Sequence, residues 1–250
     1  MSIPSDNPIL LARDLRPSEG DPAAALALAL AVGDGEVVAL TREAPAWAES
    51  DATALLRCLG GADSPACGEV WIKGTALHTL RPAARLRFGH AQCAVLPRTS
   101  GLLRELSMVD NTALPLLLAG VGRGEARKRA HLWLERLEAS DYADQRTPDV
   151  PPLGLRRVAM ARALVTDPPI LLADEPTLDL TSAERFHLLR IMRAAAGTHD
   201  LTILIATDDE AVAGWADRRI RIRAAAVDTS ELAAVAEAAA AELAESRRQA

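Results

Sequence analysis

The stretch of this sequence that most suggests chemistry is an apolar run that ends in two adjacent acids. The segment ILLADEPT covers residues 170–177, and its four apolar residues lead directly into Asp174 and Glu175. Two carboxylates at the end of a strand can support a Mg²⁺ ion and direct a water at a phosphate group. The alternative is a structural one, in which the acids accept hydrogen bonds from backbone N–H groups where the strand meets the next helix.

A phosphate site also needs a loop that surrounds the phosphates with backbone N–H groups and one lysine. The interval between two apolar runs, residues 41–54, reads TREAPAWAESDATA and contains no glycine and no lysine. The two lysines of the chain, Lys73 and Lys128, lie elsewhere, and neither follows a glycine. Arg42 and Arg57 are the nearest cations, although an arginine fork does not follow the same path as a lysine ammonium.

The elements around these residues alternate between strands and helices, which predicts an α/β domain with a largely parallel sheet. Strand patterns that end at residue 32 and restart at residue 36 flank a Gly-Asp-Gly turn, and a third strand at 68–74 adds to an antiparallel β layer. Further strands are expected at 91–97, 170–173 and 201–207, with a final strand pair at 218–227. Helices are expected at 50–59, 109–120 with an interruption at Pro115, 122–140, 154–167, 182–197 and 209–217.

Composition limits the class of protein. The net charge of −6 excludes a general nucleic-acid binder, which needs a basic surface. The three cysteines fit no zinc or disulfide spacing and indicate reduced thiols in a cytoplasmic protein. The start of the chain is too polar for a signal peptide, and the most apolar run, 23–32, is too short to cross a bilayer. The Ala-rich segment 228–250 is either a solvated tail or a helix that docks on a partner.

The order of these segments resembles the ATP-binding subunit of ABC transporters. GLRRVAMARALVTDPPILLADEPTLDLTSA, residues 154–183, is similar to the stretch from the signature helix through the Walker B strand to the D-loop. The likeness extends over roughly residues 8–225, and NTALPLLLAGV at 111–121 resembles the branch that serves lipoprotein release, macrolide export and cell division. The resemblance implies the ABC ATPase fold of the P-loop NTPase type, with residues 1–227 as one domain and a helical subdomain inserted at about 98–165.

The resemblance also implies roles for individual positions. Asp174 would hold Mg²⁺ and Glu175 would polarise the attacking water. The other site positions differ from the residues of the family. They are the phosphate loop (Asp51, Ala52, Thr53 and Ala54, with Arg57 beyond it), the glutamine of the Q-loop (Arg98), the histidine of the H-loop (Asp208) and the signature (Pro151, Pro152 and Gly154).

These substitutions favour a subunit that binds ATP and Mg²⁺ weakly or not at all, because they remove several preorganised donors at once. The resemblance then implies a cytoplasmic protein that is peripheral at the inner face of the cell membrane. It would dock on a permease through a cleft near residues 95–118 and form a homo- or heterodimer with an ABC ATPase subunit. Two alternatives stay open: an active ATPase with a rebuilt site, in which arginines and Thr53 hold the nucleotide, and a regulatory module without a transporter partner.

Overall fold

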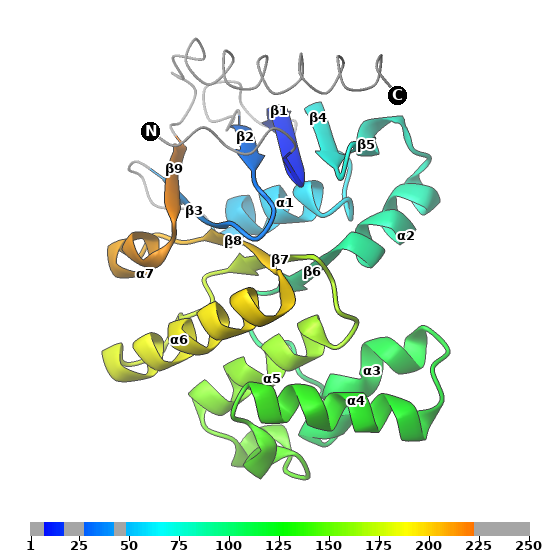
Figure 1. Ribbon diagram of the computed structural model, residues 1–250, viewed down its shortest axis with the longest axis vertical. Helices are drawn as coiled ribbons and strands as arrows, with labels where there is room; N and C mark the ends of the chain where they lie inside the picture. Colours follow the sequence, from blue (N-terminus) through cyan, green and yellow to red (C-terminus); the bar gives the residue numbers. More distant parts are fainter. Residues whose placement is uncertain (1–7, 18–27, 43–48, 223–250) are drawn as a thin grey trace.

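The computed structural model describes residues 8–17, 28–42 and 49–222, and Figure 1 shows their arrangement. A five-stranded sheet forms the centre, in the order β6-β7-β8-β3-β9, and every neighbouring pair is parallel. Its strands are β3 (Val37–Arg42), β6 (Cys93–Leu96), β7 (Ile170–Asp174), β8 (Thr202–Ala206) and β9 (Arg218–Ile222). Because the strands are parallel, their carboxyl ends meet at one edge, and Asp174 lies at that edge.

A second, antiparallel sheet covers one side of the molecule. Its order is β2-β1-β4-β5, from β1 (Leu10–Arg16), β2 (Leu28–Val32), β4 (Cys67–Ile72) and β5 (Thr75–Ala76). The sequence predicts this antiparallel layer, but it wrongly treats the strands before and after the Gly33–Gly35 turn as neighbours. Instead β2 pairs with β1, while β3 crosses into the parallel sheet beside β8 and β9.

Two hydrophobic cores lie on opposite faces of the parallel sheet, because side chains alternate along each strand. Ile170 and Leu172 of β7 face a core that also contains the antiparallel sheet and helix α1 (Glu49–Leu59). Leu171 and Ala173 face the other core, which helix α6 (Ser182–His199) covers. Every strand residue of β7 and β8 is therefore buried, as expected for a central parallel strand.

The second core continues without interruption into a helical region at the lower end of Figure 1. This region contains α3 (Met108–Leu118), α4 (Arg123–Arg136) and α5 (Pro152–Leu164). The sequence places an interruption at Pro115, yet α3 runs through it as one helix. The boundaries of a separate helical subdomain stay a prediction, since its core is shared with the sheet.

Two further α-helices complete the described chain, together with three short 3₁₀ turns at Leu77–Thr79, Ser140–Tyr142 and Thr147–Asp149. Helix α2 (Pro82–Gln92) was not expected from the sequence, because its few apolar residues give no helical stripe. Helix α7 (Glu210–Trp215) confirms the expected short helix and precedes β9. Beyond β9 the chain is not described, so the second member of the expected final strand pair and the segment 228–250 lie outside the described residues.

Candidate nucleotide-binding site

The acid pair lies where β7 ends, and both side chains are buried. Asp174 is 1% exposed and Glu175 is 8% exposed. Thr53 on α1 donates a hydrogen bond from Oγ1 to Oδ2 of Asp174, at 2.5 Å. A hydroxyl and a carboxylate therefore meet at the sheet edge, and these are oxygen ligands of the kind that Mg²⁺ accepts.

Glu175 is held by hydrogen bonds from the neighbouring strand. Its Oε2 accepts from the hydroxyl of Thr207, and its Oε1 accepts from the backbone N–H of Asp208, both at 2.8 Å. Burial raises the pKa of this carboxyl, although the two hydrogen bonds and nearby Arg98 oppose the shift. Glu175 also has a left-handed backbone with φ of 41°. Of the backbone N–H groups expected in the structural alternative, one bonds Glu175, and it comes from Asp208 in the loop after β8 and not from the junction of β7 with the next helix.

An internal ion pair lies at the start of α1, where the resemblance expects the phosphate loop. The guanidinium of Arg42, at the end of β3, contacts the carboxylate of Asp51 at 3.0 Å, and the Arg42 side chain is only 7% exposed. Asp51 lies in the first turn of α1, where a negative charge interacts favourably with the helix dipole. The next residue, Ala52, occupies the lysine position and is buried in the core at 1% exposure.

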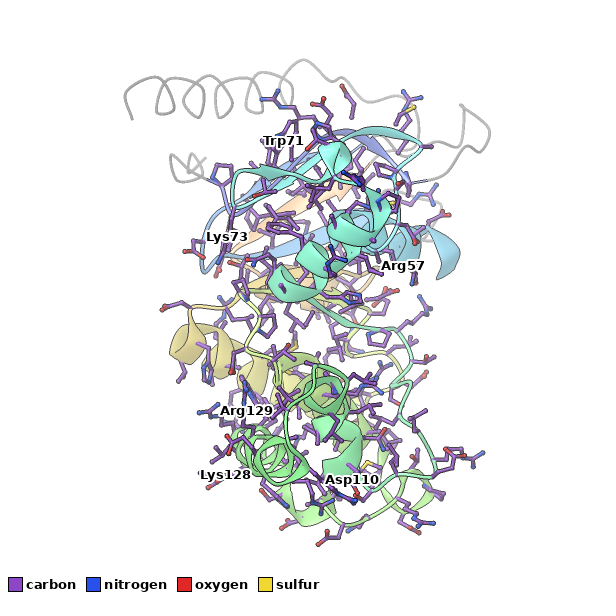
Figure 2. The ribbon with its side chains drawn as sticks, turned by 90° about the vertical axis from the view of Figure 1, so that its right-hand side faces the viewer. Arg57, Trp71, Lys73, Asp110, Lys128 and Arg129 are labelled. Atoms are coloured by element: carbon purple, nitrogen blue, oxygen red, sulfur yellow. The ribbon has the colours of Figure 1, made fainter. Side chains whose placement is uncertain are left out.

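Arg57 does not approach this position. It belongs to the last turn of α1, about 9 Å along the helix axis from Asp51 at 1.5 Å per residue. Its guanidinium makes two hydrogen bonds to the carboxylate of Asp63, at 2.6 and 2.8 Å. Figure 2 shows Arg57 on the outer surface, and its guanidinium is paired with Asp63 instead of pointing to the start of α1.

The remaining charged positions gather around the acid pair. Arg98, at the expected Q-loop position, acts electrostatically on both Glu175 and Arg156. Arg156 of α5 is 7% exposed and donates to the carbonyls of Pro97 and Leu178, at 3.2 and 3.4 Å. Burial lowers the pKa of Arg156, while the carboxylates of Asp179, Asp174 and Glu175 oppose that shift.

The expected H-loop position, Asp208, is exposed and meets Glu175 through its backbone N–H. Sequence reasoning gave Arg98 as the Q-loop position, and the structure brings it into electrostatic range of the acid pair. Sequence reasoning missed Arg156 and Thr207. Only the position of Thr207 directly after an apolar run signalled its place at the strand edge.

The expected signature segment forms the start of α5. Pro151 is the N-cap residue and Pro152 the first helical residue, and no side chain caps the helix. Neither proline has a backbone N–H to offer to a ligand. Gly154 is buried. A Cβ added there would approach side-chain atoms of Val150 and Tyr142 to 2.7 and 2.8 Å, so the position has no room for a larger residue. This glycine is therefore explained by packing.

ATP and Mg²⁺ fit this arrangement only in part. Thr53 and Asp174 would suit the metal end, but Mg²⁺ held by one or two protein oxygens depends on substrate phosphates to complete its shell. At the phosphate end, Asp51 replaces a small residue with a carboxylate and Ala52 supplies no charge. Among the described residues, no group of three or more His, Cys, Asp or Glu could hold a metal by itself. We therefore assign no reaction step to a bound nucleotide.

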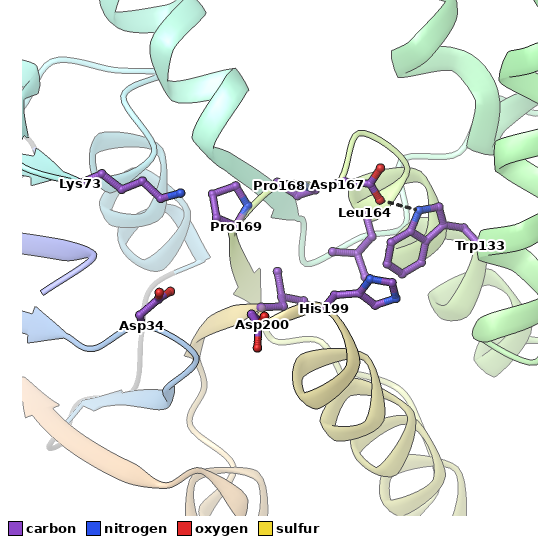
Figure 3. Close-up of a pocket in the computed structure, with 10 residues that line it drawn as sticks. Asp34, Lys73, Trp133, Leu164, Asp167, Pro168, Pro169, His199 and Asp200 are labelled. Atoms are coloured by element: carbon purple, nitrogen blue, oxygen red, sulfur yellow. Dashed lines mark hydrogen bonds between the residues drawn. The ribbon is translucent and has the colours of Figure 1, made fainter. Parts of the chain in front are cut away.

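A hollow of about 360 Å³ lies at the opposite edge of the sheet (Figure 3). Pro169 and Leu201 line it directly before β7 and β8, and Asp34 lines it shortly before β3. These are the amino ends of the strands, whereas ligands of open α/β sheets bind at the carboxyl ends. The hollow is thus separate from the acid pair.

A parallel sheet with a buried acid pair at its carboxyl edge, an antiparallel layer and a helical region together define the fold of an ABC-type ATPase cassette. The chain matches the ABC transporter family over residues 52–178, which are 127 of its 250 residues. This chain belongs to the ABC transporter ATP-binding family.

Two similar proteins are lipoprotein-releasing system ATP-binding proteins called LolD. The protein of Koribacter versatilis is 35% identical over 204 residues, which cover 82% of this chain and 90% of the relative. The protein of Chromohalobacter salexigens is 36% identical over 196 residues, which cover 78% of this chain and 81% of the relative. A dimeric ATP-binding cassette solved with ADP and phosphate has a TM-score of 0.74 at 23% identity, and the match covers 88% of this chain and 96% of that one. No helix of the described chain is both long enough and apolar enough to cross a membrane.

Proposed function

We propose that this chain is a non-catalytic ATP-binding-subunit homologue of an ABC transporter in the lipoprotein-release branch. It docks on a membrane permease at the inner face of the cell membrane and pairs with a second ATPase subunit. Its relatives named LolD support the branch, since they cover most of the chain at more than 30% identity. The single observation that carries the loss of catalysis is the Arg42–Asp51 ion pair at the start of α1.

The ion pair matters because it places a charge-balanced carboxylate at the start of α1, where the phosphates of a nucleotide would lie. In a phosphate loop, the backbone N–H groups and the helix dipole attract the phosphates of the nucleotide. Here the carboxylate of Asp51 supplies the negative charge, and Arg42 balances it at 3.0 Å. A triphosphate would have to displace this partly buried pair and would meet a carboxylate without gaining a lysine.

The acid pair and the signature segment support the same proposal. Asp174 and Glu175 keep the residue types that would hold Mg²⁺ and polarise water, yet both Glu175 oxygens already accept hydrogen bonds. Pro151 and Pro152 remove two donors from the segment that would face the nucleotide of a partner subunit. Single preorganised donors are worth roughly 10²–10³ in rate, so combined losses leave little hydrolysis.

The docking role rests on exposed apolar side chains between β6 and the end of α3. Val95 is 40% exposed, Leu103 45% and Leu118 81%. All three lie within the segment 95–118, where the resemblance places the permease-docking cleft. Arg104, in the same segment, is an exposed cation that suits an acidic partner helix.

A loop transplant tests the nucleotide part of the proposal. Residues 41–54 are replaced by a Gly-rich phosphate loop with the Gly-Lys-Ser-Thr ending, and Mg²⁺-dependent binding of a fluorescent ATP analogue is measured. We expect the transplanted chain to bind and the natural chain not to bind. The single substitution Ala52→Lys is the matched control, and it should stay inactive because Asp51 and the glycine-free loop remain.

Co-purification tests the docking part. A tagged candidate permease from the same source organism, co-expressed with this chain and extracted in detergent, should retain the natural chain and lose the variant Leu103→Asp/Leu118→Asp. A control variant, Phe186→Asp, alters an apolar residue on α6 that is 64% exposed and should still be retained. Retention of the double variant at the natural level would contradict docking through this cleft.

A further inference from the structure

The connection between β6 and α3, residues 97–107, contains neither helix nor strand. We call it the bridging loop, because it joins the sheet to the helical region (Figure 1). It carries the exposed side chains of Leu103 and Arg104, which belong to the proposed docking surface. An irregular loop has no regular ladder to satisfy its backbone N–H and C=O groups, so its conformation depends on the groups that bond them.

Two arginines of α5 bond carbonyl groups of the bridging loop. Arg162 donates from Nη1 to the carbonyl of Gly101 at 2.7 Å and from Nη2 to the carbonyl of Ser100 at 2.8 Å. Arg156 is buried and donates to the carbonyl of Pro97, the first residue of the loop, at 3.2 Å. One helix therefore holds both the beginning and the middle of the loop.

The choice of partner makes Arg162 unusual among the arginines of this chain. Burial lowers the pKa of Arg162, because a guanidinium removed from water loses hydration. Other partly buried arginines meet a carboxylate, as Arg218 meets Glu36 at 2.7 Å. Within the described ranges no acid forms an ion pair with Arg162, and its hydrogen bonds go to loop carbonyls alone. Its charge-assisted bonds therefore act on the conformation of the loop.

A buried amide of α3 supports the second half of the loop. Asn111 is fully buried, and its Oδ1 accepts from the backbone N–H of Leu103 at 2.7 Å. Its Nδ2 donates to the carbonyls of Leu103, Leu106 and Ser107, at 3.0, 3.3 and 3.1 Å. Both backbone groups of Leu103 are thus bonded to one buried side chain, while the leucine side chain itself stays exposed.

We propose that Arg156, Arg162 and Asn111 hold the bridging loop in its docking conformation before a partner binds, so that docking does not depend on a nucleotide. The inference rests on the proposed docking role and names the residues that position its contact surface. Each of these hydrogen bonds lies within the chain, so none of them waits for a ligand. A loop that already has its bound conformation avoids the ordering cost of association.

Hydrogen exchange followed by mass spectrometry tests the loop on the full chain and needs no permease. Peptides that cover residues 97–107 should exchange slowly, and millimolar ATP with Mg²⁺ should not change their rate. Arg162→Met keeps a long side chain but removes the donors, and should speed this exchange roughly tenfold or more. Arg162→Lys should give an intermediate rate, because one ammonium does not reproduce the two-pronged guanidinium.

The matched control is Arg129→Met on α4. Arg129 also donates to a backbone carbonyl, that of Val165 at 2.9 Å, but it does not bond the bridging loop. The control should leave exchange in residues 97–107 unchanged. Exchange of the natural loop at the rate of an unstructured peptide would overturn the proposal. So would an effect of Arg162→Met that is no larger in the loop than in β7.

Retention by the tagged permease connects the loop to docking. Arg162→Met should weaken retention roughly tenfold although Leu103 and Leu118 are untouched, because the binding-competent loop is less populated. Arg129→Met should be retained like the natural chain, with or without ATP. Unchanged retention of Arg162→Met, or retention that depends on ATP, would overturn the proposal. If the permease fails to retain even the natural chain, the docking role is wrong, and the exchange rates still decide whether the loop is held in advance.

The ATP-analogue titration is a separate measurement, so its outcome does not decide this one.

Discussion

At the residue scale, the acid pair keeps the two residue types of a nucleotide site, while the hydrogen-bond partners of Glu175 indicate a structural role. Asp174 and Glu175 have the types and the position that suit a nucleotide site. Yet Glu175 is bound by Thr207 and by the backbone of Asp208 at 2.8 Å each, in a buried place that raises its pKa. Such a carboxylate connects β7 to the loop after β8. We therefore infer that it is retained for the fold.

The substitution Glu175→Gln should leave the free energy of unfolding at neutral pH unchanged or raise it. The amide oxygen can accept from the N–H of Asp208, and the amide nitrogen can donate to the Thr207 hydroxyl, which rotates to accept. The raised pKa means that the natural acid loses stability as pH rises through its unfolded value, and the variant avoids that loss. Urea unfolding at several pH values measures the difference in the free energy of unfolding between the variant and the natural chain.

Glu175→Ala is the companion variant for this prediction. It leaves the Thr207 hydroxyl and the Asp208 N–H without their acceptor and should cost about 1–3 kcal/mol. A Gln variant as unstable as the Ala variant would contradict this hydrogen-bonding scheme, because it would show that a neutral amide cannot replace the carboxylate.

At the element scale, helix α5 shows how a glycine of a ligand-binding segment can be explained by packing alone. The helix begins with Pro151 and Pro152 and has no side-chain cap. Its third residue, Gly154, lies so close to Val150 and Tyr142 that no side chain fits. The position therefore excludes larger residues whether or not a nucleotide is ever present.

The substitution Gly154→Ala should lower the free energy of unfolding by about 1–3 kcal/mol, because the added Cβ overpacks the contact with Tyr142. The control is Gly124→Ala in α4, where a Cβ would meet nothing within 4 Å. The higher helix propensity of alanine should make that variant more stable by about 0.5–1 kcal/mol. Thermal and urea unfolding of both would decide, and a stabilising Gly154→Ala would show that the packing is looser than described.

At the scale of the whole molecule, the helical region is fastened to the sheet by shared core and by ion pairs. Glu138, which follows α4, accepts from His187 at 2.6 Å and from Arg190 at 2.9 Å, both on α6. The hydrogen bonds from these two side chains lower the pKa of Glu138. Within the helical region, Asp110 of α3 contacts Arg127 of α4. Burial would raise the pKa of Asp110, but the hydrogen bonds from Arg127 and Ser107 lower it. Figure 2 shows Asp110 low in the helical region.

These lowered pKa values predict that acid destabilises the protein. A carboxyl with a depressed folded pKa contributes stability above its unfolded pKa of about 4, and this is lost as pH falls through the folded value. The free energy of unfolding should therefore decrease below about pH 4. Glu138→Gln should flatten that decrease, whereas Glu135→Gln on exposed α4 should not. If the free energy of unfolding of the Glu138 variant decreased below pH 4 as steeply as that of the natural chain, the ion pair of Glu138 would not contribute to acid destabilisation.

Much of this fold follows from the sequence, because strand and helix patterns around 93–96, 123–136 and 170–206 are strongly periodic or continuously apolar. The pairing of β2 with β1 does not follow from the sequence. A Gly-containing turn has the same sequence pattern whether its two flanking strands pair with each other or join different sheets. Helix α2 is not predicted from the sequence, because its exposed arginines interrupt the apolar stripe that identifies a helix. At the site, the sequence identifies Asp174, Glu175 and the missing lysine. It cannot show that Arg42 turns to Asp51, because that contact spans nine positions and depends on how α1 meets β3.

Loss of nucleotide binding is tested most directly by titrating the purified natural chain with a fluorescent ATP analogue, with and without Mg²⁺. The Koribacter versatilis LolD relative serves as the positive control. We expect no saturation up to millimolar nucleotide, because Arg42 and Asp51 already form an ion pair where phosphates would lie. Saturable, Mg²⁺-dependent binding that Arg42→Glu abolishes would contradict it. That result would mean that this chain holds ATP in a rebuilt site.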